Sequence, residues 1–127
     1  AVALAEADAG MHGELAWLLH SAGSSEEAER EMRRSVELAE GSAHAYLQLG
    51  LYYRETQQPD LAIQALSNAR AAEPELLEPY LVLGQVYFGL GRLEDALGQY
   101  RSVLELDPQN LPAKQSLEYV LSRAEQR

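Results

Sequence analysis

Three histidines, His12, His20 and His44, are the side chains best suited to proton transfer or metal binding near neutral pH. A catalytic site needs several titratable groups that converge on one point. His12 and His44 do not recur at the spacing that the rest of the chain follows, so they face in different directions. Asp8, His12 and Glu14 do not share one helical face as three zinc ligands should. We therefore predict no catalytic site, no metal site and no cofactor, and we interpret His12 as a substitute for an aromatic residue.

Acidic side chains outnumber basic ones, with 20 Asp and Glu against 10 Lys and Arg and a formal net charge of −10. Nucleic-acid phosphates require clustered Lys and Arg. The densest basic group, Arg30, Arg33 and Arg34, lies among glutamates and is interpreted as a solvated helix with i,i+4 ion pairs. The charge thus argues against a nucleic-acid partner.

Residues of the same type recur 34 positions apart along the chain, and the structural repeats that they indicate must position any functional site. The recurring residues are Tyr46, Leu47, Leu49, Gly50 and Tyr53 in one copy and Tyr80, Leu81, Leu83, Gly84 and Tyr87 in the next. Ala62 and Pro74 likewise recur as Ala96 and Pro108, and a weaker copy precedes them. A period of 20 to 50 residues indicates repeats in which each unit buries its apolar face on the next.

The recurring residues resemble a known family. The pattern is Tyr80-x-x-Leu83-Gly84-x-x-Tyr87, followed by Ala96, Tyr100 and Pro108, and it is similar to the tetratricopeptide repeat. The resemblance implies an all-α fold, a right-handed superhelical α-solenoid of antiparallel helix pairs with about seven helices. The expected divisions are the tail of a preceding repeat helix in 1–8, repeats in 9–42, 43–76 and 77–110, and a C-terminal capping helix in 111–127.

Turn and capping residues place the helix ends. We expect helices near 10–22, 25–39, 43–56, 59–72, 77–90, 93–106 and 111–125. Gly23 and Gly91 lie where the chain must turn in a left-handed conformation, which glycine adopts at least cost. Gln57 takes that place in the second repeat and should be strained. Pro59 should open a helix, and Ser24-x-x-Glu27 predicts a capping box.

The two ends of the chain carry further expectations. Residues 1–8 match residues 35–42 after a shift of 34, which favours a segment cut from a longer array of repeats. Residues 111–127 are apolar on one side and polar elsewhere, and Glu118 replaces the glycine of the other repeats, which favours a cap. The sequence has no apolar run long enough to span a bilayer. It contains no stretch of the secretory type, and if the parent protein is exported, we expect its leader to lie outside this segment. Because the sequence has no cysteine, it does not distinguish between the cytoplasm and the bacterial periplasm as the compartment of the protein.

The resemblance also implies where a partner binds, because first helices of successive repeats line a concave groove in this family. The corresponding residues are Gly10, Gly13, Trp17, His20, His44, Leu47, Leu51, Arg54, Glu55, Glu78, Leu81, Gln85, Phe88, Gln115, Tyr119 and Ser122. Large apolar groups among them predict an apolar or amphipathic ligand segment. We expect Trp17 and Phe88 as anchors and Arg54 as an ionic contact. Alternatively, tight curvature buries these side chains against one another or against a neighbouring repeat.

One known family function is not expected. Some members clamp acidic C-terminal tails of heat-shock chaperones with Lys, Asn and Arg, and this chain has no cation at the matching places. Those places hold Gly13, Trp17, Gln48, Glu78 and Val82. The sequence thus predicts a non-catalytic scaffold for a protein or peptide partner, within a bacterial assembly such as a secretion or export machine. The alternative is a self-associating or architectural spacer whose groove holds no peptide.

Overall fold

The computed structural model describes residues 2–126, with side chains from Asp8 onward, and this part of the chain forms seven α-helices. They are α1 (Val2–Ser21), α2 (Ser25–Leu38), α3 (Ala43–Glu55), α4 (Pro59–Ala72), α5 (Leu77–Gly89), α6 (Leu93–Leu106) and α7 (Leu111–Glu125). Apart from α1, every helix begins where the sequence predicts and ends within one residue of the predicted end. No helix in the described part is both long and apolar enough to cross a membrane.

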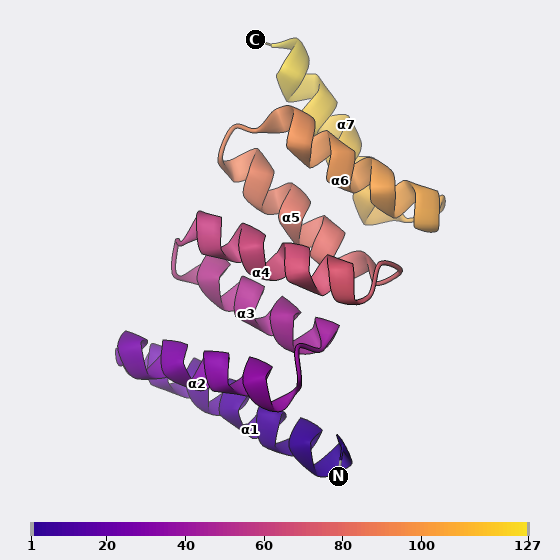
Figure 1. Cartoon of the computed structure of the whole chain (residues 1–127). Helices are drawn as coiled ribbons and strands as arrows, with labels where there is room; N and C mark the ends of the chain where they lie inside the picture. The colour runs from indigo at the N-terminus through magenta and orange to yellow at the C-terminus, as the bar shows by residue number, and fades with distance from the viewer. Residues whose placement is uncertain (1, 127) are drawn as a thin grey trace. The chain divides into compact units, whose positions relative to one another are not determined.

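The helices form two compact units, unit 1 up to Ala72 and unit 2 from Glu73. In unit 1, α1 pairs with α2 and α3 pairs with α4, while α3 also contacts α1 and α2. In unit 2, α5 pairs with α6, and α7 packs on α6. Consecutive helices of a pair run antiparallel (Figure 1). The predicted all-α class of antiparallel helix pairs is confirmed.

Helix α1 begins earlier than expected. The sequence predicts a helix tail in 1–8 and a separate helix from about residue 10, whereas α1 runs without a break from Val2 to Ser21. Alanine, glutamate and leucine dominate its first turns, and no proline or turn sequence interrupts them, so helix propensity favours continuation. Ala1 lies outside the described residues, and an origin of this segment in a preceding repeat stays a prediction.

Small residues let the paired helices approach closely. A Cβ atom added to Gly50 on α3 would lie 2.6 Å from Cγ of Leu66 on α4, and one added to Gly84 on α5 would lie 2.5 Å from Cζ of Tyr100 on α6. Ala96, facing inward on α6, is fully buried. The recurring glycine of the repeat is therefore explained by helix contact.

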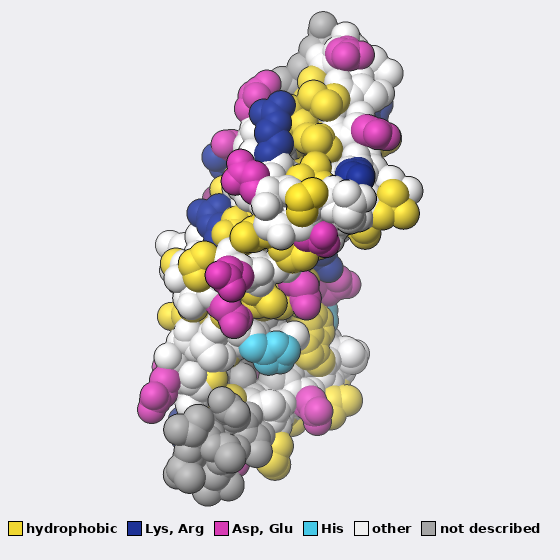
Figure 2. Space-filling view, turned by 90° about the vertical axis from the view of Figure 1, so that its right-hand side faces the viewer, with side chains coloured by type: hydrophobic (Ala, Val, Ile, Leu, Met, Phe, Trp, Pro, Cys, Tyr) yellow, Lys and Arg dark blue, Asp and Glu magenta, His cyan; other side chains and the backbone are white. Residues whose placement is uncertain are grey.

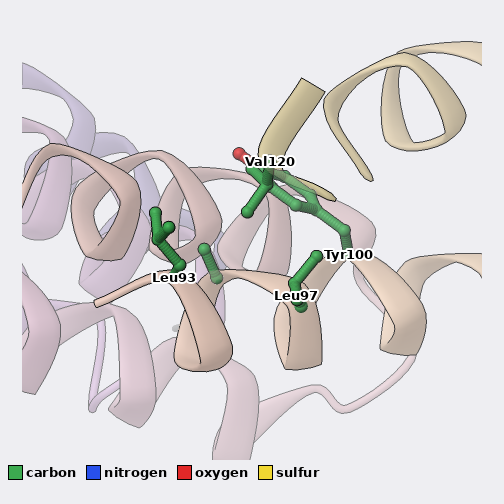
Figure 3. Packing of buried hydrophobic residues seen from close by; sticks show 5 residues of the cluster. Leu93, Leu97, Tyr100 and Val120 are labelled. Carbon is green, nitrogen blue, oxygen red and sulfur yellow. The ribbon is translucent and has the colours of Figure 1, made fainter. Parts of the chain in front are cut away.

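The core of unit 2 joins α6 to α7. Leu93, Leu97, Tyr100 and Val120 are buried together with Ala96, and Val120 of α7 lies against Tyr100 of α6 (Figure 3). Leu117 and Ala124 of α7 pack on the same cluster. The last helix is thus held by apolar side chains that recur every third or fourth residue along one of its faces.

The turns have the predicted left-handed backbone. Gly23 and Gly91 have φ values of 89° and 76°, and Gln57 has a φ of 58°. A positive φ crowds Cβ against the backbone in any residue other than glycine, so the expected strain at Gln57 is confirmed. Pro59 opens α4 as predicted.

The capping box expected at Ser24 is not formed. Ser24 precedes α2 with ψ at 66°, and its side chain accepts no capping hydrogen bond. Ser42 and Asn110 precede α3 and α7 in the extended region, with ψ at 150° and 106°, and their side-chain oxygens accept from Ala45 N at 3.2 Å and Ala113 N at 2.9 Å. Because the cap needs an extended residue to turn its oxygen back onto the helix, the backbone of Ser24 prevents it.

Three buried tyrosines make stability sensitive to alkali. Burial raises the pKa of Tyr52, Tyr53 and Tyr100 above the ordinary value near 10. The unfolded chain loses these protons first, so above about pH 10 the native state binds more protons than the unfolded state. We expect the free energy of unfolding to be insensitive to these groups below pH 10 and to fall above it. Urea titrations across this range, with tyrosinate absorbance followed in parallel, measure the effect, and the Tyr100→Phe variant should show a shallower fall. Equal slopes in both proteins would contradict the assignment for Tyr100.

Candidate partner-binding site

A pocket of about 300 Å³ lies in unit 2 among α5, α6 and α7. Its lining residues are Gln85, Phe88, Tyr100, Gln115, Ser116, Tyr119 and Val120. Gln85 and Phe88 are three residues apart on α5 and so share one face of the helix. On α7, Gln115 and Tyr119 are likewise four apart. Helices α5 and α7 both pack on α6. Residues of α5 and of α7 therefore form two sides of the pocket, and α6 contributes the buried Tyr100.

The aromatic rings of Phe88 and Tyr119 contact each other in the lining of this pocket. The ring centroids of Phe88 and Tyr119 are 5.4 Å apart, and the rings are tilted by 54°. The guanidinium carbon of Arg123, one turn further along α7, lies 5.7 Å from the centroid of the Tyr119 ring, within the range of a cation–π contact. Tyr119 keeps 54% of its surface exposed, which is high for a large aromatic side chain. A partner can therefore reach it without any unfolding of the unit.

The polar groups of the pocket are neutral. Gln85 and Gln115 are exposed at its edge, and an amide side chain both donates and accepts hydrogen bonds. Burial raises the pKa of Tyr100, and its hydrogen bond with Ser116 lowers that pKa in part, so the phenol stays protonated at neutral pH. None of the lining side chains is charged. A ligand with an apolar side chain and a polar backbone, such as a peptide, suits a pocket of this kind.

The structure brings four of the predicted site residues of unit 2 together and leaves three outside. Gln85, Phe88, Gln115 and Tyr119 line the pocket, whereas Ser122 is exposed outside it. Leu81 packs against the buried core cluster instead, and Glu78 is exposed in the first turn of α5. Hydrophobic side chains lie among acidic and basic ones on the face that Figure 2 shows.

In unit 1, the predicted residues Trp17 and His20 lie in an aromatic cluster with Tyr52. The ring centroid of Tyr52 is 5.9 Å from that of Trp17 and 5.7 Å from that of His20, both edge to face. Trp17 and His20 are half-buried. Nδ1 of His20 is buried and has no hydrogen-bond partner among the described residues. Tyr52 is not among the predicted site residues, although it lies one residue before the recurring Tyr53.

The predicted residues of α3 differ from one another in exposure. His44 and Arg54 are exposed near the two ends of the helix, and Leu51 is half-buried between them. Leu47 retains only 3% of its surface. Its assignment to an exposed lining was therefore wrong, because α3 packs on α1 and α2 as well as on α4 and buries that side of the helix.

Three lining residues of the pocket were absent from the predicted site. Tyr100 had been assigned to the repeat pattern alone and Val120 to the apolar side of the last helix, while Ser116 had been assigned no role. The signal for Tyr100 is present in the sequence, because a 34-residue shift places it on Leu66. A bulky aromatic residue takes the place of a leucine there, and it reaches both Gly84 and the pocket.

With this geometry described, comparison with known proteins identifies the class. The family model for the tetratricopeptide repeat matches residues 47–110, and the chain therefore belongs to the tetratricopeptide repeat family. It is similar to anaphase-promoting complex subunit 3 of Dictyostelium discoideum, with 34% identity over 77 residues. That match covers 61% of this chain but only 8% of the relative's length.

Solved structures share the arrangement of helices. The first tetratricopeptide domain of Spaghetti (RPAP3), bound to the HSP90 peptide SRMEEVD, superposes with a TM-score of 0.79 at 22% identity and covers 96% of both chains. The Yersinia enterocolitica type III secretion chaperone SycD, in complex with a peptide of the translocator YopD, gives 0.76 at 18% identity, covering 91% of this chain and 93% of the other. At these identities the likeness shows the fold alone.

Proposed function

We propose that the chain is a non-catalytic protein-interaction scaffold that binds an apolar or amphipathic segment of a partner protein in the pocket of unit 2. One observation carries the proposal: Phe88 and Tyr119 border a 300 Å³ pocket whose lining carries no charge, and Tyr119 is half exposed although aromatic. Aromatic side chains of this kind are the usual energetic anchors of protein interfaces. Two structural neighbours carry bound peptides, SRMEEVD of HSP90 in one and a peptide of YopD in the other, which supports a peptide as the class of ligand.

The arrangement of polar groups supports a peptide as the ligand. Gln85 on α5 and Gln115 on α7 place an amide on each wall, and the apolar surface lies between them. Such amides pair with the backbone N–H and C=O groups of a bound segment, which must keep hydrogen-bond partners when water is displaced. The Arg123 side chain next to Tyr119 favours an acidic residue beside the apolar one.

Two parts of the predicted site extend this proposal. Trp17 would provide a second anchor in unit 1, and the exposed Arg54 an ionic contact. Membership of a bacterial assembly stays a prediction from the sequence. Self-association through the same surface is the competing function, and sedimentation of the isolated chain distinguishes it from peptide binding by a monomer.

The test is selection of ligands from a displayed random peptide library, followed by affinity measurement on variants. Selected peptides should share a large apolar residue, and Tyr119→Ala or Phe88→Ala should weaken their binding by about 10-fold or more, as for interface anchors generally. Leu106→Ala is the matched control, because Leu106 is a large apolar residue on α6 with 45% exposure that does not line the pocket. Peptides that bind the Phe88 and Tyr119 variants as tightly as the native chain would refute the proposed site.

A further inference from the structure

Two hydroxyl groups lie on the inner side of the pocket of unit 2. One is the phenol of Tyr100 on α6, and the other is the hydroxyl of Ser116 on α7. Tyr100 retains 3% of its surface and Ser116 is half-buried, whereas the lining residues Gln85, Gln115 and Tyr119 are exposed. The amides therefore border the entrance, and a side chain that fills the pocket meets the hydroxyls at its far end.

The phenol of Tyr100 reaches from α6 to the helices on both sides of the pocket. A Cβ atom added to Gly84 of α5 would lie 3.0 Å from the phenol oxygen, and Ser116 of α7 forms a hydrogen bond with that oxygen. Val120 of α7 lies against the same residue (Figure 3). Contacts with both helices thus fix the position of the phenol oxygen.

The hydrogen bond between the two hydroxyls leaves bonding capacity for a ligand. This bond lowers the pKa of Tyr100 in part, which is the effect of a proton donated to the phenol oxygen, because such a bond favours the phenolate. Ser116 is therefore the donor. A hydroxyl has one donor and two acceptor positions, so the phenolic proton of Tyr100 and the lone pairs of the Ser116 oxygen can bond a ligand.

The size and the rings of the pocket suit one aromatic side chain. A volume of about 300 Å³ is at the lower end of the range for ligand pockets, so it admits a side chain and not a whole segment. The ring centroids of Phe88 and Tyr119 are 5.4 Å apart. A third ring can pack against them in the same way, because aromatic pairs prefer centroid distances of about 4.5–7 Å.

The charges around the pocket disfavour an ionised side chain in it. A carboxylate would lose its hydration among lining residues that carry no charge, and the burial of an unpaired charge is costly. A Lys or Arg side chain would in addition meet the guanidinium of Arg123, which lies 5.7 Å from the ring centroid of Tyr119. A neutral side chain with an apolar ring and a polar tip satisfies both the rings and the hydroxyls.

We propose that the anchor received by this pocket is a tyrosine of the partner segment, with its ring against Phe88 and Tyr119. Its hydroxyl accepts a hydrogen bond from Tyr100 and donates one to Ser116. The inference rests on the proposed function, since it specifies the anchor residue of the same site. A phenylalanine would displace water from the two hydroxyls without replacing its hydrogen bonds, and a site built to bond a hydroxyl rejects the analogue that lacks it.

Two peptides that differ by one oxygen atom test this specificity on the full chain. Peptides are selected from a displayed library whose central position carries Tyr, Phe, Trp and Leu in equal amounts, and one selected sequence is made with Tyr and with Phe there. Calorimetric titration should show about 10-fold or more tighter binding of the Tyr peptide. The ratio should fall toward unity in Tyr100→Phe, which leaves no phenol unpaired when the Phe peptide binds.

Two further variants complete the comparison. Ser116→Ala should also lower the ratio, because it removes the second partner of the ligand hydroxyl. Ser102→Ala is the matched control, since Ser102 lies on α6 outside the pocket and its hydroxyl donates a 3.0 Å hydrogen bond to the carbonyl oxygen of Gly98. This variant should keep the native ratio. Circular dichroism shows which variants fold, and if only one of the two pocket variants does, its ratio decides.

Two results would overturn the tyrosine specificity. Equal binding of the Tyr and Phe peptides to the native chain would show that the pocket does not distinguish a hydroxyl, while the proposed peptide site would stand. A preference for Tyr that is unchanged in the folded pocket variants would place the partner of the ligand hydroxyl elsewhere. Selection of no peptide at all would instead refute the proposed function, and this inference with it.

Discussion

Replacing Tyr52 with alanine is expected to lower the free energy of unfolding of unit 1 by about 3–5 kcal/mol, the range for large aromatic residues truncated in a core. Tyr52 retains 1% of its surface. Its ring contacts those of Trp17, His20 and Tyr53, and its hydroxyl bonds to Ser25 at the start of α2. One side chain thus joins three helices, and its removal leaves a cavity among them.

The measurement is urea unfolding followed by the fluorescence of Trp17, the single tryptophan of the chain. Because Trp17 contacts Tyr52 directly, its emission reports the unit in which the change is made. Tyr52→Phe, which removes only the hydroxyl, should cost about 0.5–1.5 kcal/mol. Tyr119→Ala, at a half-exposed site in unit 2, should shift this transition little. A loss for Tyr52→Ala no larger than that for Tyr52→Phe would contradict the burial of the ring.

The Gly50→Ala substitution should destabilise the chain by about 1–3 kcal/mol, as overpacking of a core does. The added Cβ would lie 2.6 Å from Cγ and 2.7 Å from Cδ2 of Leu66, with the backbone N of Leu66 at 3.4 Å. Leu66 is fully buried, so neither its side chain nor α4 can move aside freely. The gain in helix propensity, about 1 kcal/mol for alanine over glycine, opposes this cost without cancelling it.

Gly98→Ala provides the matched control. Gly98 lies within α6, and a Cβ added there meets nothing within 4 Å. At this position only the higher helix propensity of alanine over glycine affects stability, so the free energy of unfolding of the variant should be higher by about 0.5–1 kcal/mol. The two substitutions are chemically identical and should have opposite signs in thermal or urea unfolding. Stabilisation by Gly50→Ala would show that α3 and α4 are further apart than the structure places them.

The helices were predictable because their signals repeat. Gly23, Gly91 and Pro59 end or begin helices for local steric reasons that need no tertiary information, and the structure confirms each of them. Gln57 occupies the position that the glycines take in the other repeats, and it has the same left-handed backbone. The cap at Ser24 was not predictable, since it depends on a ψ angle that the surrounding packing fixes.

The candidate site was predictable only in part. Gln85, Phe88 and Tyr119 follow from the register of the first helices, and they do line one pocket. Leu47 occupies the repeat position of Leu81 and Gln115 and was assigned to the same lining, but it is buried, because exposure depends on how closely neighbouring helices pack. Tyr100 was missed because its side chain reaches the pocket from a second helix, where the repeat pattern gives only a core role.

NMR titration tests whether unit 2 receives an apolar peptide segment between α5 and α7. The chain is labelled with ¹⁵N and titrated with a peptide selected as described above, and backbone amide shifts are mapped on the sequence. We predict the largest changes at Gln85–Phe88 and Gln115–Val120, and we expect these changes to be lost in Phe88→Ala. Saturable binding that shifts only the charged outer surface of α2, or α1 alone, and leaves both segments unchanged would contradict it.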